Sequence, residues 1–283
     1  GDVYKRQGEK SAQESLADIE AILKKDTRMA FITAAMGGGT GTGAAPVIAK
    51  LSKDMGILTV GIVSVPARFE GPKRLDQARD GLRRLKDHVD CLIVIDNEKI
   101  KSIYGSQTIS QAFAKANDVL NIAAKGIAEI ITLPGYINVD FADVRTVMTD
   151  SGVAIMGAAQ ASGEDRAIRA ITEALESPLL NNNDILGAKD ILLNITSGTD
   201  EITMDEMSQI TSHIIRKVGN NAAVIWGVGT DPDLGDAISV TIIATGFPTG
   251  DIELFGEENT CAGYAKQPVS YTHLRAHETT LHL

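Results

Sequence analysis

Seven consecutive residues, Gly37-Gly38-Gly39-Thr40-Gly41-Thr42-Gly43, constrain this chain more than any other stretch of it. They follow an apolar run, 29–36, and precede a helix-like stretch, 44–54, which gives the order strand, loop, helix. Glycine adopts backbone conformations that other residues avoid, so such a loop can turn its N–H groups inward. The positive end of the following helix dipole adds to these donors, and Thr40 and Thr42 add hydroxyl groups. The pattern predicts a loop that binds a di- or triphosphate.

Other kinds of glycine loop fit less well. A Walker A loop needs a Lys-Ser/Thr pair at its end, and the first lysine after this loop is Lys50, well inside the helix. A dinucleotide-binding loop of a dehydrogenase needs an acidic residue at the end of the next strand. That strand ends Val63-Ser64-Val65-Pro66, without an acidic residue. From the residues alone, a phosphate loop and a plain tight turn both remain open.

The overall charge excludes some partners. The 283 residues carry a formal net charge of −10 and a pI near 5.0, so no nucleic-acid surface is expected. No apolar run approaches the length of a membrane span, which predicts no direct membrane insertion. The two cysteines, Cys91 and Cys261, do not form a disulfide framework, and a reducing cytoplasmic setting fits them.

Short apolar runs at 29–36, 57–65 and 91–95 alternate with helical patterns at 44–54 and 72–87. This rhythm predicts an α/β domain with a buried parallel sheet. A helix is expected before it, at 11–25, and a long helix after it, at 110–132. The remaining strands and helices, which predict a second α/β domain with a mixed sheet, are expected near 153–159, 164–176, 190–196, 203–218, 222–228 and 238–245.

Both ends of the chain look foreign to this pattern. Residues 1–7 do not extend the first helix, and we expect them to be non-native or disordered. The same is expected of the tail, 261–283, which carries His273, His277 and His282. No cysteine or acidic cluster completes a ligand set with these histidines, so no metal site is predicted there.

A second motif follows the long helix and reads Asn138-Val139-Asp140-Phe141-Ala142-Asp143. One interpretation is an ordinary helix start, in which Asn138 lies near the cap and both aspartates favour the helix dipole. The other is catalytic, because two carboxylates spaced i to i+3 share one face of a helical turn. Carboxylates so placed could orient a water molecule for attack on a phosphoryl group.

The glycine loop and this second motif, in this order and spacing, resemble the tubulin/FtsZ family in its FtsZ form. The resemblance covers residues 8–260 and implies a GTPase with bound GTP or GDP. It implies that Asn138, Asp140 and Asp143 act on the nucleotide held by the next subunit of a head-to-tail filament. Phosphoryl-transfer chemistry implies Mg²⁺ as well.

Further residues match the family's nucleotide-binding positions. Glu70 and Arg74, in Phe69-Glu70-Gly71-Pro72-Lys73-Arg74, would contact the ribose and a phosphate; without the match, Arg74 would be a solvated helix residue. Asn97 would touch the nucleotide, although Asp96-Asn97-Glu98 departs from the usual P-N-D. Phe113 would stack on guanine and Asn117 would read its edge. Without the resemblance, Phe113 would be a core residue of an amphipathic helix.

The resemblance also implies an organisation and partners. It divides the chain into a GTP-binding domain, 8–109, a central helix, 110–133, and a C-terminal domain, 134–260. It implies division-ring filaments at mid-cell, with other division proteins and membrane tethers as partners. The family's first phosphate loop and strands are expected to be missing here, which makes the chain an N-terminally truncated fragment. The alternative function is therefore a non-hydrolysing module that docks on or caps filaments.

Overall fold

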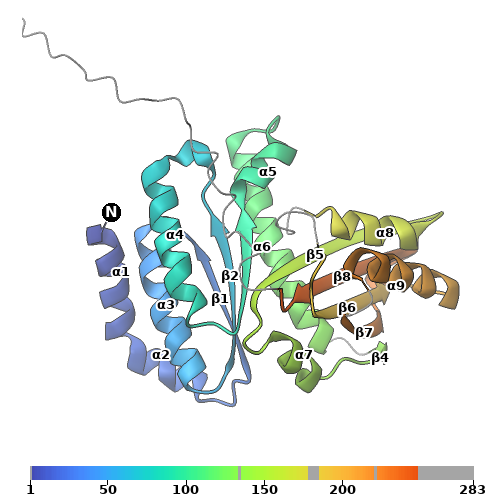
Figure 1. Cartoon of the computed structure of the whole chain (residues 1–283), viewed down its shortest axis with the longest axis horizontal. Coiled ribbons are helices and arrows are strands. Elements are labelled where there is room, and N and C mark those ends of the chain that lie inside the picture. Colours follow the sequence, from blue (N-terminus) through green and yellow to red (C-terminus); the bar gives the residue numbers. More distant parts are fainter. Residues whose placement is uncertain (1, 133–134, 178–184, 220–221, 248–283) are drawn as a thin grey trace, which may run out of the picture. The chain divides into compact units, whose positions relative to one another are not determined.

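The computed structural model describes residues 2–132, 135–177, 185–219 and 222–247. The described residues all lie within one compact unit, Gly1–Ile252. The elements up to the long helix, in chain order (Figure 1), are α1 (Asp2–Glu14), α2 (Leu16–Leu23), β1 (Met29–Ala35), α3 (Gly39–Asp54), β2 (Leu58–Val65), the 3-10 turn η1 (Arg68–Glu70), α4 (Pro72–Lys86), β3 (Cys91–Asp96), α5 (Asn97–Tyr104) and α6 (Ile109–Thr132).

The second half of the chain adds five strands and three helices among the described residues. They are β4 (Gly135–Ile137), α7 (Phe141–Met148), β5 (Gly152–Ser162), α8 (Arg166–Leu175), β6 (Asp190–Ser197), α9 (Met204–Val218), β7 (Ala223–Thr230), the 3-10 turn η3 (Pro232–Leu234) and β8 (Ala237–Thr245).

The described strands form one eight-stranded sheet in the order β1-β2-β3-β5-β8-β6-β7-β4. From β1 to β5 neighbouring strands run parallel, with Met29 opposite Leu58 and Val60 opposite Cys91. Strand β8 runs antiparallel to both its neighbours, β6 and β7 are parallel, and β4 is antiparallel to β7. The expected α/β class, with a parallel first sheet and a mixed second part, is confirmed.

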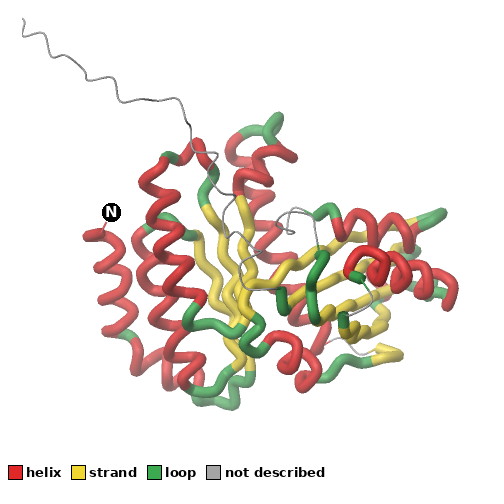
Figure 2. The backbone as a smooth tube through the Cα atoms, viewed as in Figure 1, coloured by secondary structure: helices red, strands yellow, loops and turns green. Residues whose placement is uncertain are grey.

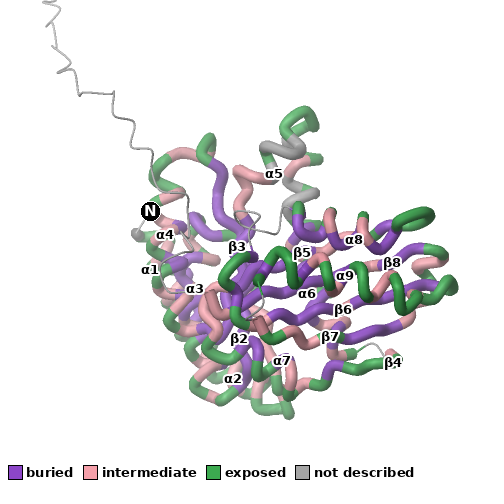
Figure 3. Tube along the Cα trace, turned by 45° about the vertical axis from the view of Figure 1, so that its right-hand side comes forward, coloured by how far each residue is buried: buried purple, intermediate pink, exposed green. Residues whose placement is uncertain are grey.

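The first core explains the near-continuous apolar runs. Helices α3 and α4 lie on one side of β1–β3 and α6 lies on the other (Figures 1 and 2), so every residue of β2 is buried. Such strands cannot alternate between apolar and polar residues, because both their faces are covered. In Figure 3 the backbone is coloured mainly as buried (purple) along these strands. The largest side chains of this core with no exposed surface include Ile62, Ile93, Ile95, Ile127, Met148 and Met156.

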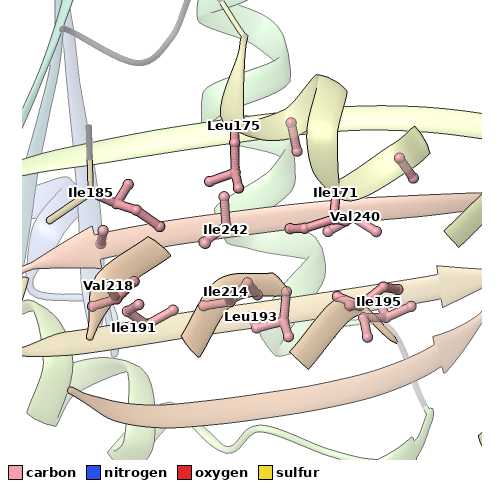
Figure 4. Close-up of a cluster of buried hydrophobic side chains, with 14 of the residues drawn as sticks. Ile171, Leu175, Ile185, Ile191, Leu193, Ile195, Ile214, Val218, Val240 and Ile242 are labelled. Carbon is pink, nitrogen blue, oxygen red and sulfur yellow. The ribbon is translucent and has the colours of Figure 1, made fainter. Parts of the chain in front are cut away.

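A second core lies under α8 and α9, where they cover β5, β6 and β8 (Figure 4). Ile171 of α8 and Ile214 of α9 point toward Val240 and Ile242 of β8 and Leu193 of β6. The apolar positions of α9, Ile210, Ile214 and Val218, recur every four residues and form its buried stripe.

The structure differs from the sequence-based expectations at several places. Residues 2–7, expected to be disordered or foreign, belong to helix α1, which packs against α3 through small residues such as Gly8. Helix α5 and strand β4 were not predicted. The tail, 261–283, lies outside the described residues, and the domain boundaries at 109 and 133 stay a prediction. Among the described helices, none has the length and apolar character needed to cross a membrane.

Candidate functional site

The glycine segment is shorter as a loop than predicted. Helix α3 begins at Gly39 with Gly38 as its N-cap, so the prediction that the helix starts at Ala44 is wrong. The five residues 39–43 form the first turns of the helix. Glycine and threonine favour loops by propensity, but here close tertiary packing overrides that preference. The loop proper consists of Gly37 and Gly38 between β1 and α3.

Close packing explains most of these glycines. A Cβ atom on Gly41 would lie 2.4 Å from the carbonyl oxygen of Ala35, and one on Gly43 would lie 2.3 Å from the carbonyl oxygen of Lys5. Gly39 likewise faces α1. Gly37 has a φ of +92°, which L side chains rarely adopt, and its Cβ would lie 2.9 Å from the carbonyl oxygen of Arg74. Only Gly38, among the five glycines of this segment, is open, with no heavy atom within 4 Å of a Cβ there.

The two threonines of the segment have different environments. Thr42 has no exposed surface, and its Oγ1 accepts a hydrogen bond from the backbone N–H of Gly37 at 2.9 Å. Thr42 therefore closes the turn. The sequence-based expectation that its hydroxyl faces a ligand does not fit this geometry. Thr40 is exposed in the first turn of α3. The unpaired N–H groups of that turn and the helix dipole favour an anion at this end.

Glu70 and Arg74 lie beside this loop. Arg74 Nη1 donates to Glu70 Oε2 at 2.6 Å, and the backbone N–H of Ala67 donates to Glu70 Oε1 at 3.0 Å. The side chain of Glu70 is only 12% exposed, whereas that of Arg74 is 58% exposed. Glu70 therefore holds the turn after β2. The guanidinium of Arg74 is accessible, and the backbone carbonyl of the same residue lies against Gly37.

Asn97 is the first residue of α5, directly after β3. Its Oδ1 is buried and has no hydrogen-bond partner among the described residues. The preceding Asp96 caps α5 by accepting from the backbone N–H of Glu98 at 2.8 Å, and burial raises the pKa of the Asp96 carboxyl. Glu98 in turn accepts from the backbone N–H of Arg68 at 2.8 Å, which joins the β2 and β3 loops. An unpaired buried acceptor of this kind suits a bound ligand donor.

The remaining predicted nucleotide contacts are on α6. Asn117 is exposed there, in the third turn of the helix that begins at Ile109. Phe113 lies one turn earlier on the same helix, and its side chain lies outside the described part of the structure. Helix α6 follows α5 directly in the chain, so both positions belong to the end of the sheet that carries Asn97. Their proposed contacts with guanine stay a prediction.

The second motif forms the start of α7. Asp140 is the N-cap, and its carboxylate accepts from the backbone N–H of Asp143 at 2.9 Å. Asp143 returns the interaction, accepting from the backbone N–H of Asp140 at 3.2 Å. Asn138 Oδ1 accepts from the backbone N–H of Gly135 at 2.7 Å. The helix-start interpretation thus describes the local structure, while one oxygen of each carboxylate has no partner among the described residues.

The glycine loop and the carboxylate turn lie at opposite ends of the parallel strands. Gly37 follows the carboxyl end of β1, whereas Arg28 precedes its amino end and stacks over the ring of Phe141, 4.1 Å from the centroid. A seven-residue strand spans roughly 20 Å. One chain therefore does not bring Asp140 and Asp143 to a phosphate bound at its own Gly38. Sequence spacing could not show this separation. The sequence gives no signal for the role of Arg28 beyond a cation placed before an apolar strand.

Two family models match this chain. Residues 2–105 match the model of the tubulin/FtsZ family, GTPase domain, and residues 152–248 match the model of the FtsZ family, C-terminal domain. The chain is 48% identical to cell division protein FtsZ of Porphyromonas gingivalis over 84% of its own length and 52% of the relative's. The corresponding values for FtsZ of Coxiella burnetii are 47%, 84% and 62%. The chain thus spans about half to two-thirds of the length of these relatives.

Solved structures agree. An empty FtsZ dimer from M. jannaschii is 42% identical, with a TM-score of 0.80, and the match covers 88% of this chain and 71% of that one. CetZ1 from Haloferax volcanii shares the fold at a TM-score of 0.70 and 21% identity, with 87% and 74% of the two chains covered. With two family models in the expected order and this level of identity, the chain belongs to the FtsZ branch of the tubulin/FtsZ family.

Proposed function

We propose that this chain is the nucleotide-binding and filament-forming part of an FtsZ-type division protein. It binds GTP at the Gly37–Gly38 loop and the start of α3. Subunits stack head to tail, and Asp140 and Asp143 of one subunit complete the hydrolytic site around the nucleotide of the next. GDP is the product, and hydrolysis weakens the contact between subunits.

The observation that carries this proposal is the separation of the loop and the carboxylate turn by the length of β1. Translation of one chain along its strands would bring the carboxylate turn of one copy toward the loop of another. Such a heterologous contact repeats without closing and generates a filament. A site within a single chain would instead require both motifs at the same end of the strands.

The residues then have distinct roles. The open surface at Gly38 and the N–H groups of the first α3 turn would hold phosphate oxygens, with Arg74 as a nearby cation. The unpaired Oδ1 of Asn97 would accept from the nucleotide, while Phe113 and Asn117 would bind guanine. Asp140 and Asp143 would orient the attacking water through their free oxygens, with Asn138 holding the turn.

Mg²⁺ is part of the proposal because it would neutralise phosphate charge during transfer. No group of three His, Cys, Asp or Glu side chains suited to a metal occurs among the described residues. We therefore propose that Mg²⁺ is held mainly by phosphate oxygens and water rather than by a cage of protein side chains. The ion would therefore enter with the nucleotide.

We place the protein in the cytoplasm, at the mid-cell division ring, with copies of itself as the main partner. Other division proteins and membrane tethers are further proposed partners. These assignments rest on family membership, and imaging of a fluorescent fusion at mid-cell tests them.

The experiment that tests the proposed activity is GTP hydrolysis as a function of protein concentration. A shared site predicts activity per molecule that rises above a threshold concentration and requires Mg²⁺. The chain is assayed alone and also with the N-terminal segment of a relative fused before Asp2, since the chain spans only about half to two-thirds of the length of its relatives. Activity per molecule independent of concentration, in whichever form is active, would contradict the shared site. A chain inactive in both forms that blocks assembly of an intact relative would instead be the capping module.

A further inference from the structure

Helix α7 carries the carboxylate turn, so its anchoring decides where Asp140 and Asp143 lie. Its inner face is part of the first core, where Val144 and Met148 have no exposed surface. Behind its last turn, the buried Thr245 hydroxyl donates to the carbonyl oxygen of Val147 at 3.1 Å. These contacts hold the inner face and the last turn of the helix, while the chain before and after it is held by other contacts.

The turn after α7 is held by Lys53. Lys53 Nζ donates to Asp150 Oδ1 at 2.9 Å and to the carbonyl oxygen of Val89 at 3.1 Å, and it lies 3.4 Å from Asp90 Oδ1. Asp90 is only 9% exposed, and its second oxygen accepts from the backbone N–H of Thr59 at 2.9 Å. Lys53 therefore joins a buried, fixed carboxylate to the exposed Asp150.

Asp150 is itself a constrained residue. Its φ of +49° lies in the left-handed region, two residues beyond the end of α7 at Met148. Aspartate adopts this conformation more readily than most non-glycine residues, and a contact of its side chain fixes it further. The ion pair with Lys53 supplies such a contact at the point where the chain leaves α7.

The start of α7 is held by a second cation. Arg28 stacks on Phe141, the residue that follows Asp140 in the turn. Among the described residues no carboxylate lies within ion-pairing distance of Arg28, so the ring is the contact that orients the guanidinium. A guanidinium over an aromatic ring is a directional contact, because its plane matches the ring face.

Both cations belong to one structural unit. Arg28 precedes β1 and Lys53 lies in the last turn of α3, while the Gly37–Gly38 loop joins these two elements at their opposite ends. We propose that Arg28 and Lys53 are positioning residues, through which the unit that carries the nucleotide loop fixes the carboxylate turn that the same subunit offers to its neighbour. This inference rests on the proposed function, because it assumes that the turn is catalytic.

The first test measures the anchoring directly, by amide hydrogen exchange of the full chain without nucleotide. The variant is Lys53→Met, and its matched control is Lys50→Met, which removes an exposed lysine from the same helix. We expect exchange in 141–151 to quicken several-fold in Lys53→Met, with α9 unchanged and with the control like the parent. Arg28→Gln should quicken the first turn of α7, and Lys25→Gln should not. Unchanged exchange in both variants would overturn the proposal.

The second test separates positioning from a purely structural role. In the hydrolysis assay, Lys53→Met should lower kcat about tenfold while KM for GTP stays within about twofold, and Lys53→Arg should restore most of kcat. Quickened exchange with normal kcat, or a rise in KM alone, would overturn the proposal. A parent protein without concentration-dependent hydrolysis would instead refute the shared site. Normal exchange in the variant of an active parent refutes only the positioning role.

Discussion

The carboxylate of Asp140 accepts a hydrogen bond from the backbone N–H of Asp143 at 2.9 Å, and the carboxylate of Asp143 accepts one from the backbone N–H of Asp140 at 3.2 Å. The two side chains thus form a capping box at the start of α7. The same atoms that start the helix hold both carboxylates in one place and leave one oxygen of each for other partners. The choice of substitution can therefore separate the effect on helix capping from the effect on the proposed catalysis.

Asp140→Asn should keep the cap and remove the charge. Asparagine and aspartate are equally good N-caps, so the free energy of unfolding should change by less than about 0.5 kcal/mol, whereas Asp140→Ala should lose about 1 kcal/mol. Both variants should lower GTP hydrolysis by about 10²-fold or more. Urea unfolding and steady-state hydrolysis measure the two effects. Full activity in Asp140→Asn would show that the cap alone matters.

Two neighbouring glycines should respond differently to alanine. Gly37→Ala forces a side chain into a φ of +92° and against the Arg74 carbonyl, so it should destabilise the fold by about 1–3 kcal/mol. Gly38→Ala meets open space and should cost less than about 1 kcal/mol, yet its methyl group would enter the proposed phosphate site. Thermal unfolding and GTP titration check both. Equal GTP affinity in Gly38→Ala and the parent would argue against phosphate binding at this loop.

Asn97→Ala removes a buried acceptor that has no partner among the described residues. The free energy of unfolding should therefore change by no more than about 0.5 kcal/mol. Affinity for GDP should fall about tenfold, which corresponds to about 1.4 kcal/mol. Asn121→Ala, at an exposed position of α6, is the matched control. A large loss of stability with unchanged affinity would assign Asn97 a structural role.

Acid should weaken the fold through Glu206. The hydrogen bonds from Arg166 lower the pKa of the Glu206 carboxyl from 4.5 to about 2, and those from Thr203 assist. Because the folded-state pKa is the lower one, the unfolded chain binds the proton more readily between these values. The stabilisation, about 3 kcal/mol, is complete above about pH 4.5 and disappears as the pH falls toward 2.

The measurement is urea unfolding at pH 7 and pH 3 of the parent, Glu206→Gln and the exposed control Glu173→Gln. Glu206→Gln should be less stable at pH 7 and should lose less stability on going to pH 3. A pH dependence identical to that of the parent would contradict the assignment to this ion pair.

The sequence was sufficient for the elements whose pattern is local. The apolar runs that became β1, β2 and β3 are bounded by turn residues, and α9 starts at a capping box formed by Thr203 and Glu206. The segment 39–43 was misassigned because its glycines are required by contacts with α1 and β1, which no local pattern shows. Strand β4 has three residues and pairs with β7, some ninety residues away in the chain, so it carries no local signal either.

The candidate site could be proposed from the sequence as a set of motifs but not as an arrangement. Gly38 was proposed from the glycine pattern, and Asn97 and Asp140 were proposed from the family resemblance. The inward turn of Thr42 depends on its bond to Gly37. Lys53 and Arg28 looked like ordinary cations, because their partners, Asp150 and Phe141, lie far along the chain. The separation of loop and carboxylates follows only from the order and direction of the strands.

The most direct measurement of the shared site is complementation between two inactive variants. Gly38→Val blocks the loop and keeps the carboxylates, whereas Asp140→Asn keeps the loop and lacks one carboxylate. In an equal mixture, about one head-to-tail contact in four would join an intact loop to an intact turn. We predict that the mixture regains about a quarter of the parent's GTP hydrolysis. A mixture no more active than the average of its two components would contradict a site shared between subunits.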